Sequence, residues 1–478
     1  MRAAWRRGLR LALCGPLFSA CALGPDYRRP ELDVPRDYQW QLPSDKSAEF
    51  GDLRWWDIYR DPLLRRALQS ALHNNLDVRI AATRIEQAQA IAGSTRLQYW
   101  PQLALNASAD RAKTSLYALL PEQARIGAIY SASIDASYEL DIWGRLRRLN
   151  EAARADLLSS VYAQQSVVVG LVADVATAYF SLISLEEQLT VTRNTVATRQ
   201  KFVELTRAKH DRGVVSGLDV STAEAELATA RANIPDLERQ IGQTEDQLSI
   251  LLGRNPGRIE RAHHFDDTPP LPPEPPAGLP SRLLERRPDI RQAEQNLVAA
   301  NARVGAAKAA LFPTLSLTGS YGVRSRELSK LFSGPANAWT AGAGLSLPLL
   351  DSQNSLYQVD LADATKREAL LTYEQVVQNA FREVSDALIA RQKYAEFQMA
   401  QQAKVQALQR ANAIALARYQ IGYSSYFDVI NSDRDLFEAQ LALAAAYLNA
   451  QLANVQLYQA LGGGWQRREA RAEGATAP

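Results

Sequence analysis

The chain has 478 residues, with 54 lysines and arginines against 52 aspartates and glutamates, and only two cysteines. Its formal net charge of +2 is too small to hold a polyanion across the whole surface, which argues against a nucleic-acid-binding protein. Hydrophobic residues make up 46% of the chain but aromatic residues only 8%, a composition that favours long helices over sheets. The length allows two or three domains of about 150 residues, or one long repetitive structure.

Residues 1–20 have the pattern of a signal peptide, with four arginines in the first ten residues and then an apolar run over residues 11–18. That run is too short to cross a bilayer as a helix of the mature protein. Cys14 lies inside it and is lost on cleavage. Cys21 follows Leu17-Phe18-Ser19-Ala20, which resembles the lipobox of bacterial lipoproteins with Phe18 where leucine is usual. The alternative is an ordinary signal peptide followed by a chance cysteine.

Acylation of Cys21 would leave the mature chain without a free thiol, as suits the oxidising periplasm. By resemblance to other lipoproteins, Ala22 in the next position is compatible with an outer-membrane destination, because aspartate is absent there. No later stretch approaches about 18 consecutive apolar residues, so the sequence argues against a transmembrane helix. Any crossing of a bilayer must then be made by strands.

Two halves of the sequence repeat each other on either side of a proline-rich stretch at 267–276, which is suited to neither a helix nor a sheet interior. The corresponding segments are Asn75–Arg79 with Arg287–Arg291, Trp100–Leu103 with Phe312–Leu315, Gly213–Val220 with Gly422–Val429, and Leu252–Gly253 with Leu461–Gly462. The offset is 212 for the first two pairs (287 − 75) and 209 for the last two (422 − 213). Four spaced correspondences indicate a tandem duplication.

Each half contains two segments in which apolar and polar side chains alternate, and we expect strands at about 102–110, 130–142, 314–322 and 339–350. This alternation and length are typical of strands that cross an outer membrane. Aromatic residues lie at or near the strand ends, as at a membrane interface: Trp100, Trp143, Phe312 and Trp339. The alternative is a soluble hairpin packed on a core by one face. Four strands cannot close a barrel of at least about eight, so the membrane interpretation requires an oligomer.

The remaining segments predict helices at about 62–98, 143–211, 219–251, 280–310, 353–420 and 428–461. The helix over 143–211 would span ~100 Å, and the shorter ones ~50–55 Å, so two stacked short helices match one long helix. Apolar residues recur every seven positions in two rows, which indicates a coiled-coil seam. The rows are Val168, Val175, Leu182, Leu189, Val196 and Val203, and Leu171, Ala178 and Leu185.

Over about residues 21–462 the chain resembles the outer-membrane efflux protein family, the TolC-like trimeric channels, and within it the lipoprotein (NodT-type) components of RND-type multidrug pumps. The segments that carry the resemblance are Cys21–Tyr27 with Pro30, Trp55-Trp56, Asp61–Leu63, Asn74–Asp77, Glu285–Ile290, and Arg418-Tyr419 leading to Gly422 and Asp428. The resemblance implies a mainly α fold with β. It also implies a homotrimer whose twelve strands form one outer-membrane barrel above a twelve-helix periplasmic tunnel. The implied partners are a periplasmic adaptor protein, an inner-membrane RND-type transporter and outer-membrane lipid.

We therefore expect a lipoprotein signal peptide at 1–20 and a lipidated N-terminal segment of the equatorial region at 21–61. The first repeat covers 62–253, a proline-rich linker 254–279 and the second repeat 280–462. A flexible tail follows at 463–478.

In the family, the turns between the long and short helices close the periplasmic end of the tunnel. Carried over by position, Asp219 and Tyr419 are lock partners, and the constriction is formed at or near Phe427, Asp428, Asn431 and Arg434. Asp219 and Asp428 are also placed to cap the helices that follow. Asn431 stands where an aspartate is common, and Ser424 where some members have a basic lock residue. We therefore expect a weak cation-binding ring and a weak ionic lock.

Gly213 and Gly422 match small residues at which adaptor hairpins dock, although turn geometry alone would also explain them. His263-His264 beside Asp266-Asp267 could ligate a metal, but on a proline-rich linker solvated side chains are the more ordinary interpretation. The sequence has neither a glycine-rich phosphate loop nor a GxSxG elbow. We expect no enzymatic activity, no metal site and no cofactor other than the lipid on Cys21.

The sequence thus predicts the outer-membrane exit duct of a tripartite efflux pump, which passively conducts drugs or other small molecules. Within the same family, a duct for type I protein secretion or heavy-metal efflux is an alternative. A different class is also open: a periplasmic coiled-coil lipoprotein, tethered by Cys21, with soluble hairpins and no channel. The substrate is not encoded here, because selection belongs chiefly to the inner-membrane partner.

Overall fold

The structure is a computed structural model that describes residues 22–38, 40, 58–113, 126–262, 264–265, 280–347 and 352–463. The signal peptide, Cys21, Trp55-Trp56, His263, Asp266-Asp267 and almost all of the C-terminal tail lie outside these ranges. The chain divides into two compact units. Unit 1 comprises Met1–Glu31, Arg84–Val161 and Gln292–Glu374, and unit 2 comprises Leu32–Thr83, Tyr162–Arg291 and Gln375–Pro478. Each sequence repeat contributes its strands to unit 1 and its helical hairpin to unit 2.

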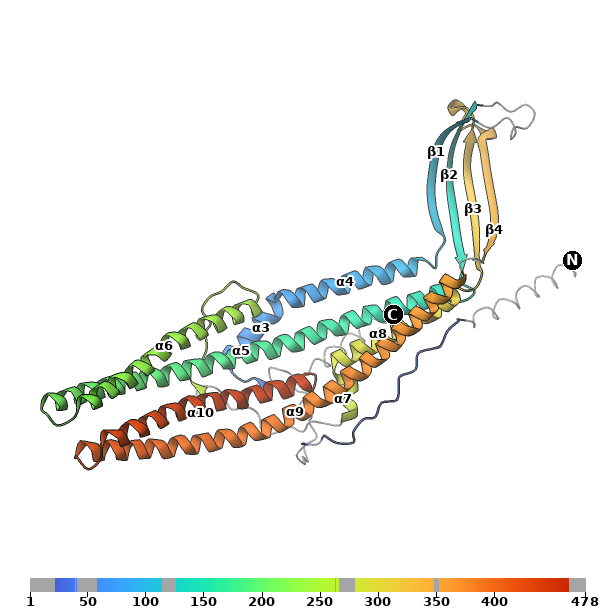
Figure 1. Ribbon diagram of the computed structural model, residues 1–478. Helices are drawn as coiled ribbons and strands as arrows, with labels where there is room; N and C mark the ends of the chain where they lie inside the picture. Colours follow the sequence, from blue (N-terminus) through green and yellow to red (C-terminus); the bar gives the residue numbers. More distant parts are fainter. Residues whose placement is uncertain are drawn as a thin grey trace. The chain divides into compact units, whose positions relative to one another are not determined.

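Unit 1 contains a four-stranded antiparallel sheet in the order β1-β2-β3-β4 (Figure 1). The strands are β1 (Gln102–Lys113), β2 (Ile126–Leu140), β3 (Thr314–Ser325) and β4 (Asn337–Ser346). Two short 3-10 turns, Leu328–Lys330 and Gly334–Ala336, connect β3 to β4. The strands therefore form where alternation predicts them, with ends shifted by a few residues. β1 and β4 are the edge strands of the sheet, and the outer edge of each pairs with no other strand among the described residues.

The register places polar residues on one face of this sheet and apolar residues on the other. On the polar face, Ser108 pairs with Ser131, and Ser131 pairs with Arg324. On the apolar face, Leu105 pairs with Ile134 and Ile134 with Tyr321. The large side chains of the apolar face are widely exposed, with Leu105 79% and Trp339 74% accessible. A soluble hairpin would cover such a face with a core, and the exposure here argues against that alternative.

The helical part of unit 1 packs closely because the contacting residues are small. Segments of α5 (Arg145–Asp211) and α8 (Pro288–Ala309) meet through an alanine cluster of Ala152, Ala155, Ala299 and Ala302. The Ser159 hydroxyl donates to Asn296 at 2.7 Å, and Arg303 pairs with Asp156 at 2.5 Å, across the same contact. Segments of α4 (Leu76–Leu97) and α9 (Ser352–Gln420) complete this part of the unit.

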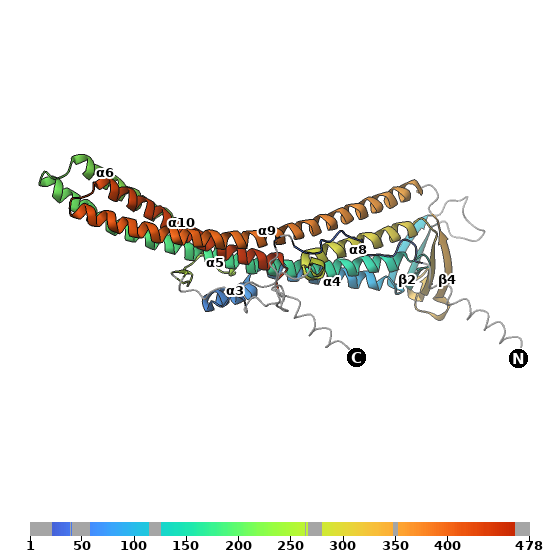
Figure 2. The same cartoon turned by 90° about the horizontal axis from the view of Figure 1, so that it is seen from below.

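Unit 2 holds two helical hairpins, α5 with α6 (Gly217–Leu251) and α9 with α10 (Tyr426–Ala460). Their turns lie at the same end of the unit, as both views of the chain show (Figures 1 and 2). The predicted seam of α5 is buried, with Val175 and Leu182 fully inaccessible and Leu189 4% exposed. The coiled-coil pattern therefore marks the packed face of α5 correctly.

The helices expected over 62–98 and 280–310 are each interrupted, and here the sequence-based prediction was wrong. The first divides into α3 (Pro62–Asn74) and α4 at Asn75, whose extended backbone (φ −59°, ψ 133°) ends α3. The second divides into α7 (Pro280–Arg286) and α8 at Arg287. Arg287 precedes Pro288, and a residue before proline is pushed out of the helical conformation.

Among the described residues, α5 is long and apolar enough to cross a membrane, as judged by length and composition alone. The most apolar 18-residue part of α5 is not an unbroken apolar run, and more than half of it is buried. A buried core helix passes the same test. The packed seam identifies α5 as such a helix.

Candidate functional site at the helix-hairpin turns

The two turns of unit 2 have the same backbone geometry. After α5, the Gly213 N–H donates to His210 O at 2.8 Å and the Val214 N–H to Lys209 O at 2.9 Å. After α9, the Gly422 N–H donates to Tyr419 O at 3.2 Å and the Tyr423 N–H to Arg418 O at 2.9 Å. This pair of bonds is the Schellman motif, which requires a left-handed residue after the helix. Gly213 (φ +74°) and Gly422 (φ +83°) supply that conformation.

The predicted docking glycines also face open space. A Cβ atom added at Gly213 or Gly422 would meet no other atom within 4 Å among the described residues. Turn geometry therefore explains why glycine is present, and the docking role stays a prediction. Large apolar residues near the two glycines in the sequence are mostly exposed: Val214, Leu218, Ile421, Tyr423 and Phe427.

Asp219 takes part in capping α6, but from the third position of the helix and not as the N-cap residue that the sequence analysis expected. Ser216 is the N-cap of α6, and its hydroxyl accepts from the Asp219 N–H at 3.3 Å. The Asp219 carboxylate in turn accepts from the Ser216 N–H at 3.0 Å, which completes a capping box.

The second turn is capped differently. Asp428 accepts from the hydroxyls of Ser424 at 2.8 Å and Ser425 at 3.3 Å, and these bonds, led by that of Ser424, hold its pKa below the usual value. The N-cap residue Ser425 makes no side-chain bond to the α10 backbone. Ser424, which stands where a basic lock residue occurs in some family members, therefore serves here as a partner of Asp428 in its own turn.

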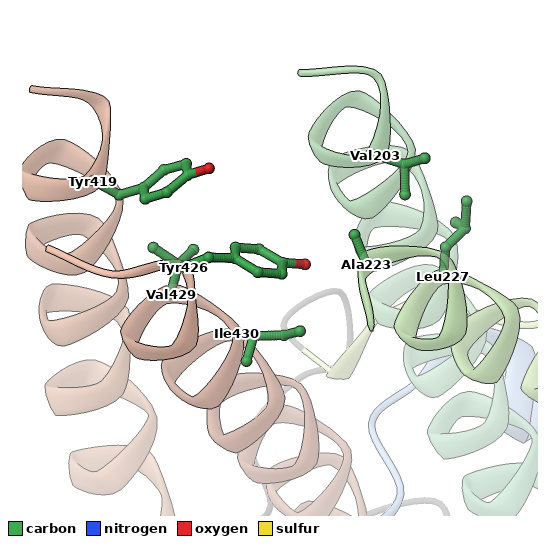
Figure 3. Packing of buried hydrophobic residues seen from close by; sticks show 7 residues of the cluster. All are labelled: Val203, Ala223, Leu227, Tyr419, Tyr426, Val429 and Ile430. Atoms are coloured by element: carbon green, nitrogen blue, oxygen red, sulfur yellow. The ribbon is translucent and has the colours of Figure 1, made fainter. Parts of the chain in front are cut away.

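Tyr419 lies in an apolar cluster that joins the two hairpins. Tyr426, Val429 and Ile430 of α10 lie with Tyr419 and face Val203, Ala223 and Leu227 of the other hairpin (Figure 3). The Tyr419 ring lies 5.7 Å from the Phe202 ring and 6.0 Å from the Tyr426 ring. The cluster holds the tips of the two hairpins together.

The predicted lock partners Asp219 and Tyr419 are neighbours without a direct bond between them. Burial and the negative charge of Asp219 both raise the pKa of Tyr419, while the Thr206 hydroxyl lowers it. The ammonium group of Lys209 lies 3.9 Å from the centre of the Tyr419 ring. The Asp219 carboxylate is engaged in its capping box, so the lock itself stays a prediction.

The other predicted gate residues lie close together along the first turns of α10. Phe427 is 68% exposed, Asp428 is also exposed, and Asn431 is half-buried. Arg434 forms an ion pair with Glu226 of α6. The structure thus gives Arg434 a partner in the other hairpin, which the sequence did not reveal.

Sequence reasoning missed the most buried charge of this region. Arg199 of α5 is only 5% exposed and bonds to Asp433 of α10 and to Glu226 of α6. A signal for it exists, since the second heptad row (Leu171, Ala178, Leu185) extends by sevens to Thr192, Arg199 and Thr206. All three of these polar residues are buried. A charge on a coiled-coil seam is a sign that a partner lies opposite.

The other candidate sites of the sequence analysis have different surroundings. His264 pairs with Glu187 at 2.6 Å, and Phe265 stacks on Tyr447 at 5.4 Å. The prediction of a solvated His264 was thus incomplete, because this end of the linker is attached to the helices of unit 2. Nowhere in the described ranges do three potential ligands gather as at a metal site.

Cys21 lies outside the described residues, but the segment that follows it is firmly held in unit 1. The Leu23 N–H donates to Trp143 O at 3.0 Å, and the buried Arg148 donates to Leu23 O, Gly24 O and Asp26. Gly24 packs so closely on Gly305 that an added Cβ would lie 2.4 Å from the Gly305 Cα. We call residues 22–29 the N-terminal strap.

The far end of this strap is held by one carboxylate. Arg29 pairs with Glu294 through two bonds of 2.7 and 2.5 Å, and the Tyr27 hydroxyl donates to Glu294 at 3.2 Å. The strap begins next to the base of the sheet, where the Trp143 indole donates to Pro313 O at 2.8 Å.

The family model of the outer membrane efflux protein matches residues 67–254 and 279–463. The chain belongs to the outer membrane efflux protein family. It is 36% identical over 472 residues to the probable efflux pump outer membrane protein TtgC of Pseudomonas putida, with 97% of each chain covered. It is 32% identical over 459 residues to the cation efflux system protein CusC of Escherichia coli, with 96% of this chain and 97% of CusC covered.

Solved structures of the family agree with the fold. The outer-membrane channel OprN has a TM-score of 0.86 at 30% identity, covering 93% of this chain and 100% of its own. The open state of the Neisseria gonorrhoeae MtrE outer membrane channel has a TM-score of 0.83 at 31% identity, covering 93% of this chain and 98% of its own. The predicted TolC-like fold, with long helices and a small sheet, is confirmed.

Family membership decides between the function classes left open by the sequence. The chain is an outer-membrane efflux channel and not an enzyme, because its family and its relatives are outer-membrane channels of efflux systems. The alternative of a periplasmic lipoprotein without a channel is thereby set aside.

Proposed function

We propose that three copies of this chain form the exit duct of a tripartite efflux pump, with one barrel of twelve strands in the outer membrane. The observation that carries this proposal is the two-faced sheet whose edge strands pair with no other described strand. Four strands cannot close on themselves, and unpaired edges in a bilayer are costly, so β4 of one copy pairs with β1 of the next. The apolar face then meets lipid and the polar face lines the lumen.

The aromatic residues fit this placement. Trp100 and Phe312 lie just before β1 and β3, at the base of the sheet, and both are exposed. Trp339 and Tyr321 form a cross-strand pair near the opposite end. Aromatic side chains at both ends of an apolar band are typical of the two interfaces of a membrane. Acylation of Cys21 would add an anchor at the base of the sheet.

The turns of unit 2 form the gate in this proposal. Threefold symmetry turns each exposed side chain near the axis into a ring of three. Asn431 contributes an amide where a carboxylate is common, so Asp428 is the one carboxylate among the four predicted constriction residues. We therefore expect weaker cation binding at this aperture than in relatives with two carboxylate rings.

Conductance in planar lipid bilayers tests both the duct and its gate. The wild-type protein should run as a heat-labile trimer and pass ions with low conductance, whereas Asp219→Ala with Tyr419→Phe should raise the conductance by loosening the closed tips. Asp236→Ala with Tyr426→Phe is a matched control, because Asp236 is exposed on the same helix and Tyr426 lies in the same cluster. No conductance by any variant would refute the duct, and equal conductance of all of them would refute the lock.

The partners in this proposal are a periplasmic adaptor at the tips and an inner-membrane transporter of the RND type. Relatives are named for antibiotic, toluene and cation efflux, so the cargo is left as a small molecule. Gly213→Arg and Gly422→Arg should abolish co-purification of the adaptor after cross-linking. Gly213→Asn and Gly422→Asn are the controls, since asparagine tolerates the left-handed conformation with a smaller side chain. Equal recovery of the adaptor with arginine and asparagine would contradict docking at the glycines.

A further inference from the structure

The strongest feature that the duct itself does not explain is the charge on the seam of α5. The Arg199 guanidinium donates to the Asp433 carboxylate at 2.7 Å and to the Glu226 carbonyl oxygen at 2.8 Å. A further oxygen, of the Glu226 carboxylate, lies 3.2 Å away. One side chain of α5 thus bonds to both α6 and α10, which belong to different hairpins.

The charges around Arg199 are balanced and mostly enclosed. The side chain of Arg199 is 6% exposed, that of Glu226 15% and that of Asp433 21%. Glu226 also pairs with Arg434, so two cations face two carboxylates, and the Phe437 ring lies 5.3 Å from the Arg199 guanidinium. Separation of such a buried group from its partners is far more costly than separation of an exposed pair.

The surroundings make this contact a point of tight attachment. The apolar cluster of Figure 3 lies against the charges, and a cavity of about 60 Å³ between them is lined by Arg199, Glu226, Tyr426 and Asp433 among others. If the hairpins slid past each other, Arg199 would lose its partners inside a closed contact. If they parted, the cluster would be exposed to water.

An exposed ion pair within one hairpin lacks these properties. Arg207 of α5 pairs with Glu224 of α6 at 2.6 Å, but the two side chains are 58% and 44% exposed and both belong to one hairpin. An exposed pair of this kind contributes little to stability. It cannot hold one hairpin to the other.

Given the proposed duct, we propose that Arg199 is the positioning residue of the gate: it holds the two helical hairpins of one subunit together as one block and so sets the resting closure of the aperture. Arg199 touches no substrate in this role. It acts through Glu226 and Asp433, whose helices carry the residues of the turns.

The first test compares two arginines of α5 in planar bilayers. Arg199→Met should raise the ratio of open to closed time about tenfold or more, as expected for the loss of charge-assisted bonds. The matched control Arg207→Met should change it less than about twofold. Heat-labile trimers in both samples show that folding is retained. Equal behaviour of the two variants would overturn the proposal, whereas a silent wild-type protein would instead refute the duct.

A second test distinguishes loss of the Arg199 contact from a general folding defect of the variant. Arg199→Cys with Asp433→Cys should gate like Arg199→Met. A bis-thiosulfonate reagent, which bridges the two cysteines through two disulfide bonds and releases two sulfinates, should return the variant to the wild-type open-to-closed ratio. A reducing agent that cleaves the bridge should open it again. Because the same molecules pass between the two states, a bridge that forms without restoring closure would overturn the proposal.

Discussion

The two repeats build the same joint between short helices from different residues. In the first, Asn75 lies between α3 and α4, and its amide nitrogen donates to Leu251 O at the end of α6, at 3.0 Å. In the second, Arg287 lies between α7 and α8 and donates to Ala460 O at the end of α10, at 3.0 Å. The duplicated sequence therefore preserves which carbonyl is reached, while the side chain that reaches it has changed.

The remaining atoms show how each residue suits its joint. The Asn75 side-chain oxygen accepts from the N–H groups of Asp77 and Val78, so it also caps α4. The Arg287 side chain has no acceptor: the Nη1 group that donates to Ala460 O also donates to Glu383, and the other two nitrogens donate to Asp289. Pro288 begins α8 without an N–H to satisfy, so that helix needs less capping. The two repeats thus share the position of the helix break and the carbonyl that is bonded there, but they use different side-chain groups to make the bonds.

The largest expected difference between the joints concerns their glycines. A Cβ at Gly253 would lie 2.4 Å from Asn74 O, whereas one at Gly462 would lie 3.2 Å from the nearest atom, Arg287 Cα. Both have positive φ. Gly253→Ala should lower the free energy of unfolding by about 3 kcal/mol, and Gly462→Ala by about 1–2 kcal/mol, because strain and overpacking add at the first joint.

Loss of helical circular dichroism on denaturant titration in detergent measures this difference. Gly93→Ala is the control, because Gly93 lies inside α4 with nothing within 4 Å of an added Cβ. It should be neutral or slightly stabilising. Equal losses at Gly253 and Gly462 would show that the tighter approach at the first joint is not maintained in solution.

The second largest expected difference between the joints is how the stability cost of a mutation depends on salt concentration. Asn75→Ala should cost about 1–2 kcal/mol at any ionic strength, because it removes a cap and leaves the half-buried Leu251 carbonyl without this partner. Arg287→Met should cost a similar amount at low salt and less at about 1 M salt, because its partners Asp289 and Glu383 are partly exposed and are screened. The same denaturant titration at two salt concentrations measures both. An Asn75→Ala effect that falls equally with salt would contradict the distinction.

The smallest expected effects are at the tips, where the two turns differ in their caps. Ser216→Ala breaks a complete capping box and should cost about 1 kcal/mol. Ser425→Ala should cost a few tenths at most, because the Ser425 hydroxyl caps no backbone N–H. Hydrogen exchange of the first turns of α6 and α10 resolves effects of this size. Equal protection losses would mean that the two turns depend on their serines alike.

Acid should act on the second turn through Asp428. Its pKa is lowered in the folded protein, so its bonds stabilise the turn above the ordinary aspartate pKa and are lost as the pH falls below about 4. Asp428→Asn should remove this pH dependence from the exchange at the start of α10. If the pH dependence of the exchange persisted in Asp428→Asn, it would have to come from another carboxylate.

Periodicity alone was sufficient to predict the strands and long helices, because alternation and heptads depend on which face of its own element each side chain occupies. The break at Arg287 was also accessible, since Pro288 follows it. The break at Asn75 was not, because the carbonyl that its side chain meets is 176 residues away. At the tips, resemblance located the turns and Asp219, and continuation of one heptad row would have found Arg199. Glu226 and Asp433 could not be predicted as its partners, because that pairing depends on how two hairpins pack.

The N-terminal strap has a consequence for how a lipid anchor would work. Ala22 packs so closely on Gly144 that a Cβ added at Gly144 would lie 2.8 Å from the Ala22 Cα. The strap is therefore already fixed one residue after Cys21. Neighbouring α-carbons are about 3.8 Å apart. An acyl chain on Cys21 would therefore be separated from the fixed part of the protein by one peptide unit, which would keep the protein close to the membrane surface. Three such attachments define a plane, and they would orient a trimer toward the bilayer independently of its strands.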